Sequence, residues 1–185
     1  MAAEYHFVTN WKIPGTAHEV AEVLGDPLGL ARWWPSVYLQ VRELEPGEPD
    51  THIGRVIDLY TKGWLPYTLR WRFKVTESRG DAGFVLVADG DFVGTGVWTL
   101  EQHGDTVDVQ YDWRIRADKP LLRYGSLIFR PVFGANHRWA MARGEESLKL
   151  ELQRRRAKTE AERRAVPAPP GPTFARIPST PRREG

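Results

Sequence analysis

The side chain best suited to proton chemistry is that of His137. The sequence has five histidines, at positions 6, 18, 52, 103 and 137, and only His137 falls on the apolar side of a predicted helix. An imidazole titrates near neutral pH, so inside a cavity it could act as a general acid or base, or donate a hydrogen bond. A helical histidine that is capped by a backbone carbonyl, or half exposed at a cavity mouth, produces the same pattern. We favour this second interpretation, which leaves His137 as a weak catalytic candidate.

Other motifs that carry chemistry are absent or incomplete. The chain has no cysteine, which excludes disulfides and thiolate chemistry, and its histidines lack the spacing of metal ligands. We therefore expect no metal and no cofactor. Gly94 and Gly96 precede a predicted strand, whereas the glycines of a dinucleotide motif precede a helix. Asp89 and Asp91 flank a bend, and we interpret them as turn residues because the spacing of a calcium loop is missing.

Aromatic residues alternate with charged ones along the predicted strands. In residues 67–75 the apolar side chains take the odd positions, and Arg70, Arg72 and Lys74 take the even ones. A strand has a period of two, so the sheet has one charged face and one aromatic face. The aromatic face needs a cover, which either packs tightly or leaves a pocket for a flat or apolar molecule. The residues predicted to line such a pocket are Trp34, Trp64, Tyr67, Trp71, Phe73, Trp98, Tyr111, Trp113, Phe133, His137 and Met141.

Seven strands and three helices can be predicted from periodicity and turn signals. The strands cover residues 5–11, 36–44, 53–61, 67–77, 84–88, 95–102 and 106–117, and two short helices cover 16–24 and 28–34. Thr16 and Glu19 form a capping-box pattern at the start of the first helix. A long helix extends from about residue 120 to 156, with Pro131 and Gly134 expected to kink or divide it. This order predicts an α+β fold in which a curved antiparallel sheet wraps around the last helix.

Two features of these elements leave alternatives open. Asp58 and Tyr60 lie in a strand with ambiguous alternation; an inward Asp58 would be a buried carboxylate and a site candidate, but we favour the outward orientation. Ala140 and Gly144 share the helix face of His137. Small residues there either leave volume for a ligand or allow the helix to pack closely on the sheet.

Composition separates a body from a tail. We predict one ligand-binding domain over residues 1–156 and a basic, proline-rich, disordered tail over 157–185, since residues 151–185 contain nine Lys and Arg against four Asp and Glu. The basic cluster could contact an anionic membrane surface weakly, but a solvated helix end is favoured, and we expect no nucleic acid partner. Because the sequence shows neither a secretory signal nor a transmembrane run, we expect a cytoplasmic protein.

The order of elements and several segments resemble the START/Bet v 1-like (SRPBCC) superfamily, in particular its polyketide cyclase/dehydrase and lipid-transport group. The resemblance covers about residues 4–153 and rests on the segments 13–24, 26–27, 32–35, 63–69 and 94–100 and on the final amphipathic helix. It implies the helix-grip fold, with a deep hydrophobic cavity between the sheet and the long helix. Members of such families bind lipids, sterols, polyketides or plant hormones, and a minority catalyse cyclisation or dehydration.

Three functions follow as hypotheses. The first is binding of a hydrophobic small molecule, lipid-like or polyketide/aromatic, with His137, Tyr67 and Asn136 setting its orientation. The alternative is a polyketide cyclase/aromatase or a dehydratase that uses the same cavity, although no catalytic motif identifies one. The third is an interaction protein whose own side chains fill the cavity and whose basic tail binds a partner.

Overall fold

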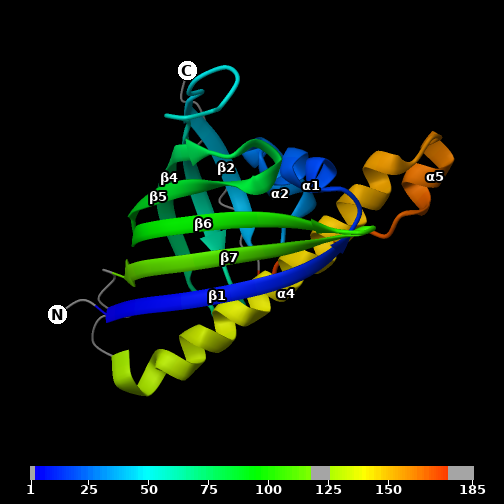
Figure 1. Ribbon diagram of the computed structural model, residues 1–185. Helices are drawn as coiled ribbons and strands as arrows, with labels where there is room; N and C mark the ends of the chain where they lie inside the picture. Colours follow the sequence, from blue (N-terminus) through cyan, green and yellow to red (C-terminus); the bar gives the residue numbers. More distant parts are fainter. Residues whose placement is uncertain (1–2, 118–125, 175–185) are drawn as a thin grey trace, which may run out of the picture.

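The computed structural model describes residues 3–117 and 126–174, and its main feature is one curved sheet of seven strands (Figure 1). The sheet order is β1-β7-β6-β5-β4-β3-β2, and all neighbouring strands are antiparallel. The strands are β1 (Ala3–Pro14), β2 (Tyr38–Glu45), β3 (Val56–Lys62), β4 (Thr68–Ser78), β5 (Gly83–Gly90), β6 (Phe92–His103) and β7 (Thr106–Ala117).

The long helix α4 (Ser126–Arg156) runs along the sheet beside β1 (Figure 1). The other helical segments are α1 (Ala17–Leu24), η1 (Pro27–Gly29), α2 (Leu30–Trp33), η2 (Gly80–Ala82) and α5 (Glu160–Ala165). Within the part of the chain that the structure describes, no helix is both long and apolar enough to cross a membrane. The arrangement confirms the predicted α+β fold, in which a seven-stranded antiparallel sheet curves around a C-terminal helix and short helical segments follow the first strand.

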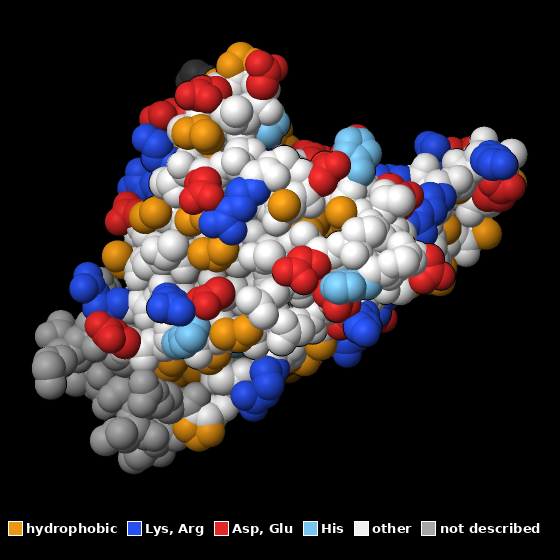
Figure 2. Space-filling view, in the orientation of Figure 1, with side chains coloured by type: hydrophobic (Ala, Val, Ile, Leu, Met, Phe, Trp, Pro, Cys, Tyr) orange, Lys and Arg blue, Asp and Glu red, His pale blue; other side chains and the backbone are white. Residues whose placement is uncertain are grey.

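Alternation along the strands explains the two faces of the sheet. In β4, the odd-numbered side chains from Leu69 to Val75 are buried, while Arg70, Arg72 and Lys74 are exposed. Acidic and basic side chains are mixed over the face shown in Figure 2. The aromatic inner face therefore forms the core against α4, as the period of two requires.

Strand β3 has the same alternation, which settles the orientation of Asp58. Ile57 and Leu59 are fully buried, whereas Asp58 lies on the outer face and accepts a hydrogen bond from Arg42 at 3.3 Å. Tyr60 also faces outward, with the guanidinium of Arg70 4.5 Å from its ring centroid. Asp58 is thus a surface charge and not a buried site residue.

The short helices join the N-terminal region to the end of α4. Helix α1 begins with the predicted capping box, in which Thr16 and Glu19 exchange hydrogen bonds. The carboxylate of Glu19 also accepts hydrogen bonds from Arg156, at 2.7 and 2.8 Å. The predicted helix over 28–34 is instead a 3₁₀ turn, η1, followed by the single turn of α2, because Pro35 leaves no room for a longer helix.

Helix α4 is continuous, so Pro131 and Gly134, which were expected to kink or divide it, do not divide it. Pro131 is the sixth residue of the helix, where a proline removes one i→i−4 backbone hydrogen bond, yet the helix continues through it. The expected start of the helix near residue 120 lies outside the described residues.

The segment after α4 turns back over the domain. Helix α5 begins with a second capping box, formed by Thr159 and Glu162. Farther along, the carbonyl of Pro167 accepts a hydrogen bond from Arg154 at 2.8 Å, and the hydroxyl of Thr173 donates one to the carbonyl of Gly63 at 3.4 Å. Composition predicted a disordered tail over 157–185; the structure gives residues 157–174 a helix and these contacts, and residues 175–185 lie outside the described part.

Candidate functional site

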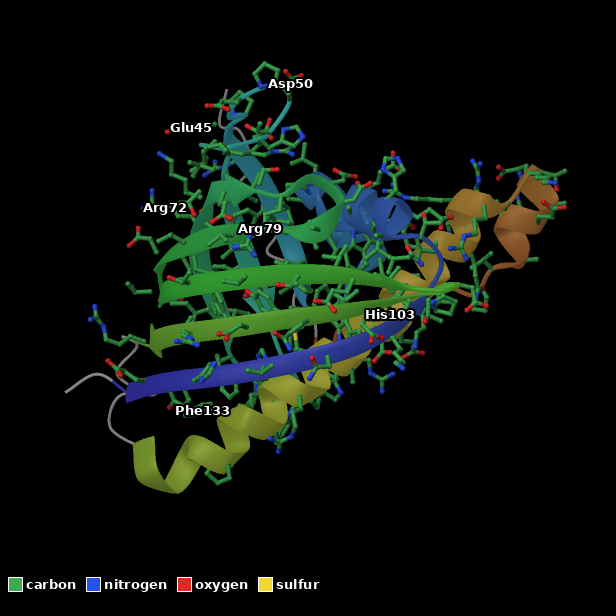
Figure 3. All side chains as sticks on the ribbon, in the orientation of Figure 1. Glu45, Asp50, Arg72, Arg79, His103 and Phe133 are labelled. Atoms are coloured by element: carbon green, nitrogen blue, oxygen red, sulfur yellow. The ribbon has the colours of Figure 1, made fainter. Side chains whose placement is uncertain are left out.

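A cavity of about 120 Å³ lies between the inner face of the sheet and α4. Ten of its twenty lining residues are Phe, Tyr or Trp. Strands β1, β4, β6 and β7 supply aromatic side chains from the sheet, and α4 supplies Phe133, His137, Ala140 and Met141 from the opposite side. Figure 3 shows Phe133 between α4 and β1, and its ring meets that of Tyr5 edge to face at 6.1 Å.

Eight of the residues predicted from the sequence line this cavity: Trp34, Tyr67, Trp71, Tyr111, Trp113, Phe133, His137 and Met141. The other three do not. Phe73 lines a different hollow, Trp98 is buried beside the cavity and stacks on Tyr111 at 4.1 Å, and Trp64 is 37% exposed in the connection between β3 and β4. Its residue type alone suggested that Trp64 lines the cavity. Trp64 lies in a loop, where no alternation of side chains indicates which way it points.

Several residues that line the cavity were not predicted from the sequence. Tyr5 and Phe7 come from β1, where their odd positions gave the signal, and Phe92 and Tyr38 come from the starts of β6 and β2. Lys62 was missed because a lysine at a strand end is typical of the surface. Its burial depends on residues distant in the sequence.

A cluster of tryptophans separates this cavity from a second hollow. Trp11 packs against Trp34 at 5.7 Å and Trp98 at 5.4 Å, and Trp33 packs against Trp34 at 5.4 Å. The second hollow, of about 600 Å³, lies between α1 and the β4–β5 end of the sheet, and no residue lines both spaces. Trp11, Trp33 and Trp98 are thus buried core residues that do not line the cavity.

His137 is a partly buried, neutral imidazole. Its Nε2 lies 3.3 Å from the hydroxyl of Thr9, and its ring stacks on Phe7 with centroids 4.3 Å apart. Burial, with a smaller contribution from Arg138, lowers the pKa of His137 from 6.5 to about 4. The Thr9 hydroxyl is therefore a partner of His137, the ring is partly exposed in the cavity, as one of the two placements favoured from the sequence has it, and it is uncharged at pH 7.

The tyrosines of the cavity also stay neutral. Burial, with a contribution from Tyr5, raises the pKa of Tyr67 to about 12. Burial raises the pKa of Tyr38 above its ordinary range, and burial together with Tyr38 does the same for Tyr111. Their hydroxyls are consequently hydrogen-bond donors throughout the neutral pH range.

Small residues on α4 have different roles. A Cβ at Gly144 would overlap the indole ring of Trp34, so this glycine allows close packing and leaves no free volume. Ala140, one turn earlier, lines the cavity and does leave volume there. Each of the two alternatives left open by the sequence therefore holds for one residue.

One end of the cavity is polar. Asn136 accepts a hydrogen bond from the backbone N–H of Leu65 at 3.3 Å, and Gly63 lies so close to the Asn136 amide that a Cβ would overlap it. Thr61 accepts a hydrogen bond from the indole of Trp71 at 3.0 Å. Beside them lies Lys62, which is only 4% exposed and whose pKa is lowered by burial.

The remaining sequence candidates have structural roles. Asp91 accepts a hydrogen bond from the backbone of Arg70 at 2.7 Å, and Asp89 pairs with Arg72 at 3.3 Å. Gly96 allows the hydroxyl of Tyr111 and the ring of Trp113 to pack closely. Within residues 3–117 and 126–174, no group of three His, Cys, Asp or Glu side chains could hold a metal ion.

No protein-family model matches this sequence, and no curated protein sequence matches it either. Solved structures do resemble it. A protein from Thermus thermophilus has a TM-score of 0.64 at 14% identity, covering 83% of this chain and 100% of its own. The Zhui aromatase/cyclase from a Streptomyces species has a TM-score of 0.62 at 20% identity, covering 84% and 97%.

A third neighbour is a START superfamily protein from Mycobacterium smegmatis. Its TM-score is 0.60 at 12% identity, and the match covers 80% of this chain and 96% of that protein. All three matches cover at least 80% of this chain, and identities of this size establish the fold alone. The chain therefore has the helix-grip fold that START-like proteins share with polyketide aromatase/cyclases.

Proposed function

We propose that this protein binds a small, flat and mainly apolar molecule in the aromatic cavity between the sheet and α4. The observation that carries the proposal is the lining itself, where ten aromatic side chains surround a few polar groups at one end. Aromatic walls with a small number of placed polar groups are typical of small-molecule sites. The fold shared with START-like proteins supports the same role.

The size of the cavity restricts the ligand. About 120 Å³ is less than the roughly 300–1,000 Å³ of common ligand sites, because aromatic side chains occupy much of the space under the sheet. A molecule with one aromatic ring fits this volume better than an extended lipid chain does. A ring that buries roughly 150 Å² would gain about 4 kcal/mol before the costs of association.

The electrostatics favour binding over catalysis. A general acid or base works best when its pKa lies near the operating pH. The pKa of His137 is about 4 and that of Tyr67 is about 12, so neither exchanges protons readily at pH 7. A cyclase or dehydratase reaction, the alternative that the resemblance to aromatase/cyclases raises, would need a proton-transferring group that these residues do not supply.

Two measurements test the proposed binding. Native and then denaturing mass spectrometry of the purified protein should reveal a small co-purified aromatic compound. Saturation-transfer NMR with benzyl alcohol should show transfer to the ring protons for the wild-type protein. Ala140→Phe, which fills the cavity, should abolish it.

A matched control uses the same helix. Ala142 lies two residues from Ala140 but is exposed, so Ala142→Phe adds the same side chain outside the cavity and should leave the transfer unchanged. The proposal fails if the wild-type protein gives no transfer, or if Ala140→Phe and Ala142→Phe behave alike while both remain folded by circular dichroism.

A further inference from the structure

Lys62, the last residue of β3, lies where the aromatic cavity meets the surface. Two residues, Lys62 and Tyr67, line both the cavity and an outer groove of about 470 Å³ between β2, the β3–β4 connection and Phe174. Lys62 is 4% exposed, which is unusual because lysine is rarely buried without a partner. Lys62 thus lies between the cavity and the groove, and its Nζ is on the groove side, 5.7 Å from the centroid of the Phe174 ring.

No opposite charge compensates this ammonium among the described residues. Neither the cavity nor the groove is lined by Asp or Glu, and the structure records no ion pair for Lys62. The ring of Phe174, 5.7 Å from Nζ, offers only a weak cation–π contact, and His137 is neutral. Partial burial of the ammonium without a counter-charge is unfavourable, and it lowers the pKa of Lys62.

The polar groups near Lys62 complement an anion. The hydroxyls of Tyr38 and Tyr67 remain protonated, so they can donate hydrogen bonds. The amide oxygen of Asn136 is already used by the N–H of Leu65, which leaves its NH₂ group as a donor. These donors line the same cavity as Lys62, and a cation together with hydrogen-bond donors is what a carboxylate prefers.

We propose that Lys62 binds the carboxylate of the ligand, so that the molecule held in the aromatic cavity is an aromatic acid. This inference rests on the proposed binding function and adds the chemical class of the ligand. Its ring lies among Trp71, Trp113 and the other aromatic side chains, and its carboxylate lies at the polar end, toward the groove. The carboxylate supplies the counter-charge that the described residues around Lys62 do not.

Isothermal titration of the full-length protein with benzoate and with benzyl alcohol tests the inference. The two probes have the same ring and differ in charge. The wild-type protein should bind benzoate at least tenfold more tightly than benzyl alcohol, since a charge-assisted hydrogen bond contributes roughly that much. Lys62→Met should weaken benzoate binding tenfold or more and change benzyl alcohol binding by less than about twofold.

Two further variants control for charge and folding. Lys74→Met removes a lysine from the exposed face of β4 and should leave both affinities unchanged. Lys62→Arg keeps the charge and should keep the preference for benzoate, which provides a second variant if Lys62→Met does not fold.

The outcomes separate the two proposals. If benzyl alcohol binds but benzoate is not preferred, or if the preference survives in Lys62→Met, the role of Lys62 is wrong and the proposed cavity function stands. If Lys62→Arg loses the preference for benzoate over benzyl alcohol as fully as Lys62→Met does, the shape of the lysine side chain and not its charge is responsible. That result also overturns the inference. If neither probe binds the wild-type protein, the proposed function itself fails.

Discussion

His137 shows how burial changes the chemistry of a residue. From the sequence it was a candidate proton-transfer group, because its ordinary pKa lies near neutrality. In the fold, Phe7 stacks on its ring and the Thr9 hydroxyl meets its Nε2. The imidazole is therefore a neutral polar group that can orient a ligand.

The depressed pKa of His137 makes stability depend on pH. Because the pKa is about 4 in the folded protein and 6.5 in the unfolded chain, the unfolded chain binds more protons between these values. The stability from the neutral ring is complete above about pH 6.5 and is lost as the pH falls toward 4. NMR titration of the ring protons should give a midpoint near 4, and His137→Gln should reduce the slope of unfolding free energy against pH.

The same residue should not affect ligand binding near neutral pH. Since His137 stays uncharged from pH 5.5 to 8, the affinity for benzyl alcohol should be constant over this range. A midpoint of the His137 titration near 6.5 would contradict the account, because it would mean that the ring is solvated and not enclosed by the cavity.

The burial of Lys62 could not be predicted from the pattern of its own strand. In β3 the even positions, Asp58 and Tyr60, face outward, so the period of two assigns Lys62 to the surface as well. Tyr67 and Phe174 line a groove with Lys62, and Phe174 comes near it only after the chain has folded. A pattern within one strand contains no information about such covering segments.

At the scale of elements, an ion pair between the half-exposed Arg32 and the buried Glu151 fastens α2 to α4. Glu151 is 2% exposed, and its carboxylate accepts two hydrogen bonds from Arg32, at 2.7 and 2.8 Å, and one from Arg155 at 3.0 Å. Burial alone would raise the pKa of Glu151, but the hydrogen bonds from Arg32 and Arg155 outweigh it and lower the pKa.

Removing Arg32 should therefore destabilise the protein. Arg32→Ala leaves the buried carboxylate of Glu151 with fewer donors, and we expect the free energy of unfolding to fall by about 2 kcal/mol in urea denaturation. Arg42→Ala is the matched control, since Arg42 forms an exposed pair with Asp58 and its loss should cost less than ~0.5 kcal/mol. Equal effects of the two substitutions would show that burial of Glu151 does not matter.

The glycines of α4 provide a second test of packing. Gly144→Ala should improve helix propensity by about 1 kcal/mol, yet the new Cβ would overlap the buried ring of Trp34. We expect a net loss of about 1–3 kcal/mol from this overpacking, measured by urea denaturation.

Gly134→Ala is the control, because its Cβ would meet only the flexible end of Arg138 at 3.3 Å and Phe7 at 4.0 Å. This substitution should be neutral or stabilising by up to ~1 kcal/mol. If Gly144→Ala also stabilises the protein, Trp34 does not pack on α4 as described.

Elements with a clear period or cap were predictable, and their mutual contacts were not. The alternation in 67–77 and the capping box of Thr16 and Glu19 each specify local geometry within a few residues. The contact of Trp34 with Gly144 and the pair of Arg32 with Glu151 join residues more than a hundred positions apart. These long-range contacts decide which aromatic side chains line the cavity and which fill the core.

At the scale of the whole molecule, the chain after α5 covers the groove outside the cavity. Phe174 lines this groove with Lys62 and Tyr67, and Thr173 is hydrogen-bonded to Gly63. Four of the residues from 167 to 172 are prolines. Because proline fixes the backbone dihedral φ, this segment has few backbone conformations available to it.

Deleting residues 166–185 should speed ligand entry. The groove loses its cover, so the association rate of benzoate measured by stopped-flow Trp fluorescence should rise several-fold, while the melting temperature changes little. Deleting only residues 175–185 keeps Thr173 and Phe174 and should leave the rate unchanged. Identical rates for the two truncations would mean that the segment 166–174 does not guard the entrance.

The most direct test of the account is a crystal structure with 4-bromobenzyl alcohol, located by the anomalous signal of bromine. The account predicts one strong peak inside the aromatic cavity, among Trp71, Tyr111 and Trp113. A peak only in the larger hollow between α1 and the β4–β5 end of the sheet would contradict this prediction. The absence of any bound 4-bromobenzyl alcohol would contradict it as well. Either result would mean that the aromatic residues under the sheet form a closed core and that the ligand site lies elsewhere.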